Sequence, residues 1–167
     1  TLGVDRLYAL KARHQTKALP IMVANAGQLA DLGVIISPAV EKLLNSPFMP
    51  GALTIVAAID PKKCPDWLCG RDEVAFRIPN SPFLLDVLAQ AGPLLVTSAN
   101  LAGAPTQQTV CDLLAQLTGA PDLVVQGEAG ADIASTLVNC SKNPAVIERV
   151  GAVSMADLSK WVAVRHG

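Results

Sequence analysis

The sequence is poor in charged and aromatic residues. Charged residues make up 16% of the chain and aromatic residues 4%, and 13 Lys and Arg stand against 14 Asp and Glu. The chain therefore lacks the excess of positive charge that is typical of nucleic-acid-binding domains, and any anion site must be local. The hydrophobic share of 51% excludes a disordered chain. A length of 167 residues predicts one globular domain with a single core.

Long apolar runs and metal-binding patterns are also absent. The longest apolar run, residues 53–59, is far shorter than the roughly 20 residues that span a bilayer, so we predict no membrane segment. The two histidines, His14 and His166, supply no ligand pattern, so we predict no zinc site. The cysteines form no C-x-x-C pair and are expected to be free thiols: Cys64, Cys69, Cys111 and Cys140.

Several nucleotide-binding and hydrolase motifs are missing as well. The chain has no G-x-x-x-x-G-K-[ST], no G-x-G-x-x-G and no Ser-His-Asp set. Nothing therefore supports a P-loop, a Rossmann or a serine hydrolase assignment.

Helical and strand patterns alternate along the chain. Helices are expected over residues 4–12, 28–32, 38–44, 83–91, 109–117 and from Ser154 onward, the last two opening with capping boxes. Strands are expected at residues 19–23, 53–59, 74–78, 94–96, 123–125, 137–138 and 146–147. This order predicts one α/β domain with a mixed sheet, because the strands after residue 123 are too closely spaced for parallel pairs alone.

Basic residues gather near the start of the chain. Lys11, Arg13 and Lys17 follow Arg6 with no acid after Asp5. A compact ammonium beside a planar guanidinium suits a phosphate chain or a carboxylate. The alternative is a solvated helix face.

Three polar segments lie at the ends of apolar elements. Thr97-Ser-Ala-Asn100 follows a strand, where open α/β sheets hold ligands, although an Asx turn explains it equally well. Ser135-Thr136 follows the glycine-bearing loop 127–130 and offers hydroxyls to phosphates, or else simply starts a strand. Pro50-Gly-Ala-Leu-Thr54 is typical of a turn before a buried strand.

Taken in order, these segments resemble one family. The motifs are K-x-R with a following K-x-L-P, P-G-x-L-T, V-A-F-R-I-P, T-S-A-N-x-x-G-x-P, S-T-[LV]-V and R-x-G-A-[IV]-S, running from about Leu7 to Ser154. In this respect the chain is similar to the YrdC family of threonylcarbamoyl-adenylate synthases. The resemblance implies a YrdC-like α/β fold, with helices flanking a twisted mixed sheet and a concave, anion-binding cavity.

The resemblance also implies a function. The implied enzyme is a cytoplasmic nucleotidyltransferase that converts L-threonine, bicarbonate and ATP into threonylcarbamoyl-AMP and pyrophosphate. The product is used for tRNA modification. The reaction is expected to need Mg²⁺ and no organic prosthetic group. Lys11 and Arg13 resemble the catalytic cations, and Ser98 and Asn100 resemble nucleotide-binding residues. Ser135 and Thr136 resemble hydroxyls near the phosphates, and Arg149 resembles a residue that closes the nucleotide side of the site.

Three departures from the family pattern stand out. The T-[DE]-T-x-[YW]-G-L segment and its strand are not found ahead of Thr1, so we expect residues 1–167 to lack the first strand of the domain. Asn139 replaces the usual Asp of S-T-V-V-D, a change expected to weaken a metal or polar contact. Ala52 replaces a proline in P-G-P-L-T.

Two other functions remain open at this stage. One is a non-catalytic module of the same fold that binds tRNA or double-stranded RNA, which the near-zero net charge disfavours. The other is the carbamoyl-adenylate domain of a larger carbamoyltransferase. Partners beyond the three substrates would be tRNA or the proteins that transfer the threonylcarbamoyl group.

Overall fold

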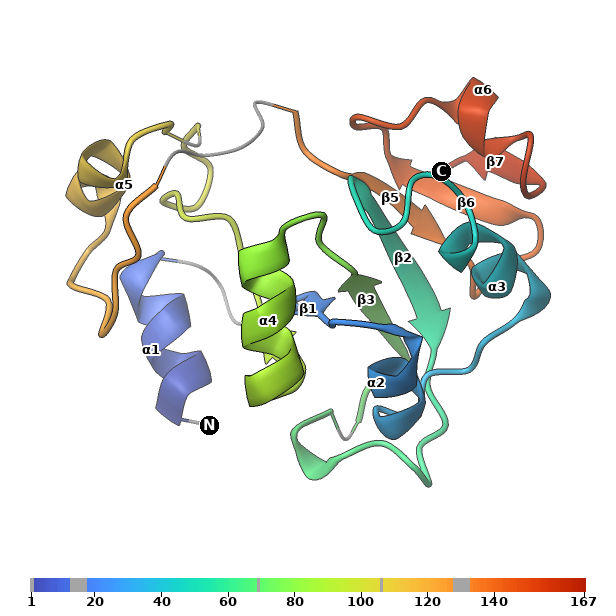
Figure 1. The fold of residues 1–167 in the computed structure, drawn as a ribbon, viewed down its shortest axis with the longest axis horizontal. Coiled ribbons are helices and arrows are strands. Elements are labelled where there is room, and N and C mark those ends of the chain that lie inside the picture. Colours follow the sequence, from blue (N-terminus) through green and yellow to red (C-terminus); the bar gives the residue numbers. More distant parts are fainter. Residues whose placement is uncertain (1, 13–17, 69, 106, 128–132) are drawn as a thin grey trace. The chain divides into compact units, whose positions relative to one another are not determined.

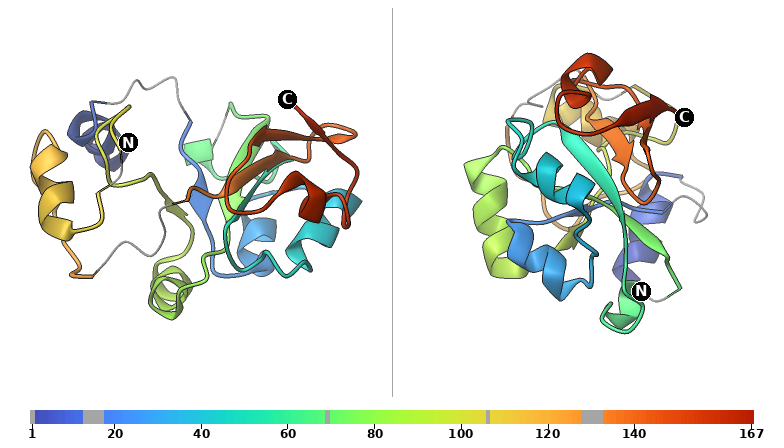
Figure 2. Two further views of the ribbon diagram at one scale, coloured as in Figure 1. Left: turned by 90° about the horizontal axis from the view of Figure 1, so that it is seen from above. Right: turned by 90° about the vertical axis from the view of Figure 1, so that its right-hand side faces the viewer.

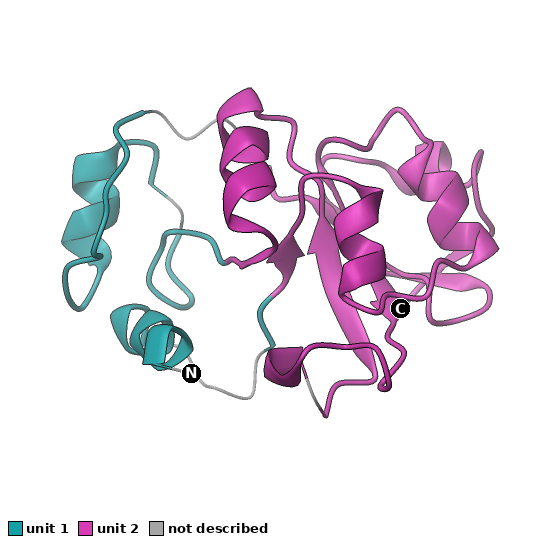
Figure 3. Cartoon of the chain, turned by 60° about the horizontal axis from the view of Figure 1, so that its bottom comes forward, with its two compact units in different colours: residues 1–19, 97–132 teal, residues 20–96, 133–167 magenta. Residues whose placement is uncertain are grey.

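The computed structural model describes residues 2–12, 18–68, 70–105, 107–127 and 133–167 (Figure 1). These residues group into two compact units (Figure 3). Unit 1 comprises residues 1–19 and 97–132, and unit 2 comprises residues 20–96 and 133–167. Arg13 and Lys17, two of the predicted anion-binding residues, lie outside the described residues.

Unit 2 is built on a seven-stranded mixed sheet, as predicted. Its strands run in the order β4-β1-β3-β2-β5-β6-β7. Parallel pairs join β1 to β3, β2 to β5 and β6 to β7, whereas β1–β4, β2–β3 and β5–β6 are antiparallel. The strands are β1 (Ile21–Met22), β2 (Leu53–Ala58), β3 (Glu73–Arg77), β4 (Leu94–Leu95), β5 (Thr136–Asn139), β6 (Ala145–Arg149) and β7 (Val164–His166).

Helices of unit 2 cover one face of this sheet (Figure 2). They are α2 (Ala26–Asp31), α3 (Pro38–Leu44), α4 (Pro82–Ala91) and α6 (Met155–Leu158). A short 3₁₀ helix also spans Asp66–Leu68. The core between helices and sheet includes Leu29, Leu43 and Leu158 from the helices and Ile55 and Phe76 from the strands. Because side chains alternate along a strand, the neighbours of Ile55 and Phe76 face away from the helices.

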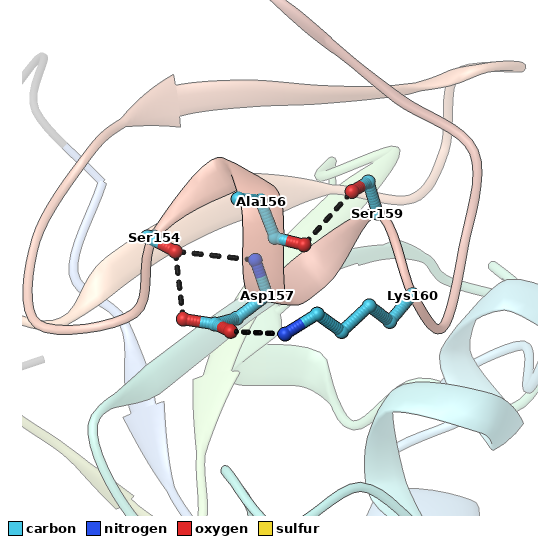
Figure 4. A network of polar contacts seen from close by, with 5 residues as sticks. All are labelled: Ser154, Ala156, Asp157, Ser159 and Lys160. Carbon is cyan, nitrogen blue, oxygen red and sulfur yellow. Dashed lines mark hydrogen bonds and ion pairs between the residues drawn. The ribbon is translucent and has the colours of Figure 1, made fainter.

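Side-chain caps begin α3, α4, α5 (Val110–Gln116) and α6 where the sequence predicts them. Ser154 Oγ accepts a hydrogen bond from the Asp157 backbone N–H at 3.1 Å and donates to Asp157 Oδ2 at 2.7 Å (Figure 4). Lys160 then contacts the same carboxylate at 2.8 Å. These contacts, led by the hydrogen bond from Lys160, lower the pKa of Asp157. The predicted N-cap at Ser154 is therefore confirmed, although the Asp157 carboxylate accepts from the Ser154 hydroxyl, whereas a complete capping box uses the Ser154 backbone N–H.

Unit 1 holds α1 (Leu2–Leu10) and α5 (Val110–Gln116). Thr118 ties the segment after α5 to the end of α1, since its Oγ1 donates to the Ala9 carbonyl at 2.7 Å and its N–H to the Leu10 carbonyl at 3.1 Å. An exposed ion pair joins Arg6 to Asp122 at 2.8 Å.

Two strand predictions differ from the structure. Residues 123–125 form no strand, and Leu123 is 80% exposed. The prediction was wrong because an apolar run forms a strand only where a neighbouring strand accepts its hydrogen bonds. In contrast, β7 was missed, since Val-Arg-His carries no apolar alternation and depends on pairing with β6.

Candidate functional site

The sheet topology of unit 2 brings four polar side chains to one end of the sheet. Strands β2 and β5 run together, and β3 and β6 run opposite to them. The starts of β2 and β5 therefore meet the ends of β3 and β6. Thr54 lies near the start of β2, Ser135 directly precedes β5, and Arg77 and Arg149 end β3 and β6. We call these four residues the arginine cluster.

Ser135 is at the centre of the arginine cluster. Its Oγ lies 2.8 Å from Thr54 Oγ1, and both side chains are buried. Arg149 donates to the Ser135 carbonyl from Nε at 3.1 Å and from Nη2 at 2.8 Å, and Nη2 lies 3.2 Å from Ser135 Oγ. Ser135 and Arg149, both predicted from the sequence as site residues, are thus in direct contact.

Arg77 adds a second guanidinium to the arginine cluster. Its Nε donates to the Gly51 carbonyl at 2.7 Å, which fixes the side chain at the end of β3. Burial, and then the positive charge of Arg149, lower the pKa of Arg77. Within the described residues neither arginine makes an ion pair with a carboxylate. Two guanidiniums that repel each other without an acidic partner are suited to a bound anion.

Thr136 adjoins Ser135 in sequence but points to the other side of the strand. Its side chain is 0% exposed. Its Oγ1 donates to the Val153 carbonyl at 2.6 Å and accepts from the N–H groups of Gly151 at 2.9 Å and Val153 at 3.0 Å. A hydroxyl has one donor and two acceptor positions, so all three are used inside the protein. A contact with phosphates was predicted for Thr136, but in this geometry its hydroxyl has no donor or acceptor position left for a phosphate.

Unit 1 brings together three further residues predicted from the sequence. Lys11, only 4% exposed, donates from its ammonium to the carbonyl oxygens of Ser98 and Asn100 and to Asn100 Oδ1 at 3.4 Å. The Ser98 hydroxyl donates to the same Oδ1, and Asn100 Nδ2 donates to the Ala104 carbonyl. We call Lys11, Ser98 and Asn100 the lysine cluster. The lysine and arginine clusters belong to different units.

Asn139 lies at the far end of β5, about 13 Å along the strand from Ser135. It is 2% exposed. Its Nδ2 donates to Glu148 Oε1 at 2.8 Å and to Glu73 Oε2 at 3.3 Å, and its Oδ1 accepts from the Ser141 N–H at 2.9 Å. Asn139 therefore bridges two carboxylates, a contact that the negatively charged side chain of an aspartate cannot make.

Sequence reasoning missed two residues of the arginine cluster. Arg77 was interpreted only as the polar position of a half-buried strand, and Thr54 as part of a turn. A signal was present for Arg77, since it is a charged residue that follows the apolar Val-Ala-Phe stretch of β3. Arg149 is remote from Arg77 in the sequence, so only the order of strands in the sheet indicates that the two residues belong to one cluster.

Other features of the described residues do not coincide with the arginine cluster. A hollow of about 360 Å³ opens near the opposite end of β5, lined by residues that include Lys42, Cys140 and Lys142. Within the described ranges, no group of three or more His, Cys, Asp or Glu side chains could hold a metal ion. No helix of the described chain is long and apolar enough to cross a membrane.

Comparison with known proteins gives a family. The model of the Sua5/YciO/YrdC family, described as telomere recombination, matches residues 2–151. This range includes both clusters.

Individual relatives have similar sequences and folds. The chain is 30% identical over 174 residues to a threonylcarbamoyl-AMP synthase of Bacillus subtilis, covering 99% of this chain and 49% of that protein. It is 39% identical over 133 residues to one from an Enterobacter species, covering 77% and 68% of the two chains. The crystal structure of P. abyssi Sua5 complexed with L-threonine matches with a TM-score of 0.85 and 25% identity, over 98% of this chain and 49% of that one. The chain thus spans about half the length of the B. subtilis and P. abyssi proteins.

Proposed function

We propose that this chain, which belongs to the Sua5/YciO/YrdC family, catalyses the synthesis of threonylcarbamoyl-AMP from L-threonine, bicarbonate and ATP, with release of pyrophosphate. Relatives that carry the name of this activity cover nearly the whole chain. The observation that carries the proposal is the arginine cluster, where Arg77 and Arg149 lie close together with no carboxylate partner among the described residues.

Arg77 is the proposed site for the carboxylate of threonine. Its Nε is occupied by the Gly51 carbonyl, whereas its two terminal nitrogens make no hydrogen bond within the described part of the chain. Two parallel N–H groups at the end of a guanidinium match the two oxygens of a carboxylate. A related structure, P. abyssi Sua5, was solved with L-threonine bound.

Arg149 and Ser135 are the proposed contacts to the phosphates of ATP. The guanidinium of Arg149 is fixed on Ser135, and the Ser135 hydroxyl is shared with Thr54. A fixed cation beside a hydroxyl can bind the oxygens of a phosphate without reorganising as charge develops.

The lysine cluster is the proposed nucleotide-binding part of unit 1. The ammonium of Lys11 holds the backbone of Ser98 and Asn100, so the turn that carries these side chains has a defined shape. We assign Ser98 and Asn100 to the nucleotide, and Lys11 and Arg13 to the anionic groups of the substrates. Arg13 lies outside the described residues, so its role rests on the sequence motif.

The chemistry needs positioning rather than a side-chain nucleophile. Threonine nitrogen and bicarbonate give a carbamate with loss of water, and a carbamate oxygen then attacks the α-phosphorus of ATP. The bond from this phosphorus to the pyrophosphate oxygen breaks as the new bond forms. Each participant is anionic, so cations and hydroxyls that neutralise charge and align the groups supply the catalysis. Mg²⁺ would enter with the ATP phosphates and supply additional positive charge there.

The product would serve tRNA modification in the cytoplasm, with tRNA or the proteins that transfer the threonylcarbamoyl group as partners. These assignments rest on the family and not on a contact among the described residues. An RNA-binding module without catalysis is the alternative, and the formal net charge of −1 disfavours it.

Pyrophosphate release tests the proposal. The protein should release pyrophosphate from ATP only when L-threonine and bicarbonate are both present, and Arg77→Ala should abolish most of this release. Lys142→Ala, which removes a charge near the opposite end of β5, is the matched control and should retain it. Salt-dependent tRNA binding without any threonine-dependent release would favour the RNA-binding alternative.

A further inference from the structure

The backbone ladder between β5 and β6 is irregular near the end of β6. Leu137 pairs with Arg149 and Val138 pairs with Ile147, so the register shifts between these two pairs. A shift of this kind leaves one residue unpaired and locally disrupts the ladder. Arg149 therefore lies directly beyond an irregular step of the ladder, where side-chain contacts can add to the backbone pairing.

The side chain of Thr136 provides such a contact. Its hydroxyl binds the N–H of Gly151, two residues after Arg149, and both the N–H and the carbonyl of Val153. Thr136 is fully buried and sits one residue after Ser135, the residue on which the Arg149 guanidinium lies. We call Thr136, Gly151 and Val153 the threonine latch.

The backbone at Gly151 and Ala152 packs closely against the backbone at Ala134 and Ser135. A Cβ atom added to Gly151 would lie 2.1 Å from the Ala134 carbonyl oxygen and 2.6 Å from the Ser135 carbonyl carbon. The Ala152 N–H also donates to the Ala134 carbonyl at 3.0 Å. The segment after Arg149 is thus stacked directly on the backbone that carries Ser135, with no room for a side chain at residue 151.

We propose that Thr136 is a positioning residue, whose hydroxyl latches Gly151 and Val153 so that the Arg149 guanidinium is held on Ser135. It acts through Arg149 and touches no substrate. This inference rests on the proposed function only in the step from Arg149 to catalysis, since the latch itself is a structural relationship. The hydroxyl is the group that the latch requires, so serine should preserve the latch whereas valine keeps only the shape.

Hydrogen exchange of the wild-type protein tests the latch without any substitution. The amides of Gly151 and Val153 both donate to Thr136 Oγ1 and should be protected from exchange. Exchange of both amides at the rate of an exposed loop would overturn the latch.

The Nε–H signal of Arg149 in NMR spectra measures how firmly the guanidinium is held on Ser135. Thr136→Val removes all three hydrogen bonds, so the exchange of Arg149 Nε–H with water should accelerate by about tenfold. Thr136→Ser should restore the wild-type rate. Ser37→Ala removes the cap of α3 in the same unit and is the control for a general loss of stability. An unchanged Arg149 signal in a folded Thr136→Val protein would overturn the proposal.

Kinetics separate the latch from the proposed function. Thr136→Val should lower kcat/KM for pyrophosphate release by roughly tenfold to a hundredfold, as a misplaced charge does, while Thr136→Ser and Ser37→Ala stay near wild type. If the Arg149 signal moves but the wild type releases no pyrophosphate, the latch stands and the proposed function fails. If activity falls equally in Thr136→Val and Ser37→Ala with no change at Arg149, the latch fails.

Discussion

Arg77 and Arg149 lie close enough that the charge of Arg149, after burial, is the second cause that lowers the pKa of Arg77. Arg77 still carries its charge beside that of Arg149, since the guanidinium pKa starts far above neutral pH. Their mutual repulsion is an unfavourable term in the unliganded protein, and an anion placed between their donors removes it.

Pyrophosphate should therefore stabilise the protein through the arginine cluster. At ten times its dissociation constant, a ligand that binds only the folded state raises the free energy of unfolding by about 1.4 kcal/mol. We expect this rise in the wild type and in Lys142→Ala, and little of it in Arg149→Ala. Urea unfolding with and without pyrophosphate measures it. An equal rise in Arg149→Ala would place the anion elsewhere.

Asn139→Asp should destabilise unit 2. The substitution replaces two amide donors, which serve Glu73 and Glu148, by a third carboxylate. Losing the donors to two charged acceptors should cost about 1 to 3 kcal/mol of unfolding free energy at neutral pH. The matched control combines Asn139→Asp with Glu148→Gln, where the glutamine amide can donate to the carboxylate introduced at position 139 and recover part of the loss. Unchanged stability of the Asn139→Asp protein would mean that the bridge contributes little.

Cys140 should make the stability depend on alkaline pH. Burial raises the pKa of its thiol from 9.0 to about 12. Between these values the unfolded chain has lost this proton and the folded chain keeps it, so stability falls as pH rises from about 9 toward 12. The wild type should lose unfolding free energy more steeply over this range than Cys140→Ala does, as measured by urea unfolding at several pH values. Identical slopes would show that the thiol ionises freely in the folded state.

Local signals in the sequence identified most elements, because caps and alternation are local. The Ser37 and Ser154 caps and the alternation of β3 are examples. Residues 123–125 were wrongly predicted as a strand, and β7 was missed. Both errors have one cause, because strand formation depends on a partner strand that the sequence does not identify.

The candidate site was predictable by residue type but not by orientation. Ser135 and Thr136 are neighbouring hydroxyls, and alternation says only that they face opposite sides. The sheet decides that Ser135 faces Thr54 and Arg149, whereas Thr136 faces Val153. Likewise, Arg77 becomes a candidate only when the sheet order is known, since β2 and β5 are the two strands that separate β3 from β6.

Lys11→Met should loosen unit 1. The buried ammonium of Lys11 binds two carbonyls and one side-chain oxygen of the 98–100 turn, and methionine keeps the length without a donor. Losing hydrogen bonds from a charged donor to these partly buried acceptors should cost about 1 to 3 kcal/mol. Hydrogen exchange of Ala102, whose N–H donates to the Lys11 carbonyl at 3.0 Å, should accelerate. Unaltered exchange at Ala102 would show that the turn holds its shape without the lysine.

The most direct test of the central claim measures threonine-dependent pyrophosphate release by the wild type, Arg77→Ala and Lys142→Ala under identical conditions. If the arginine cluster binds the substrate anions, Arg77→Ala should lose about 2 to 4 kcal/mol in kcat/KM for threonine, because truncating one partner of a hydrogen-bonded charge pair costs about this much. Lys142→Ala should match the wild type. A wild-type rate in Arg77→Ala at subsaturating threonine would contradict the account.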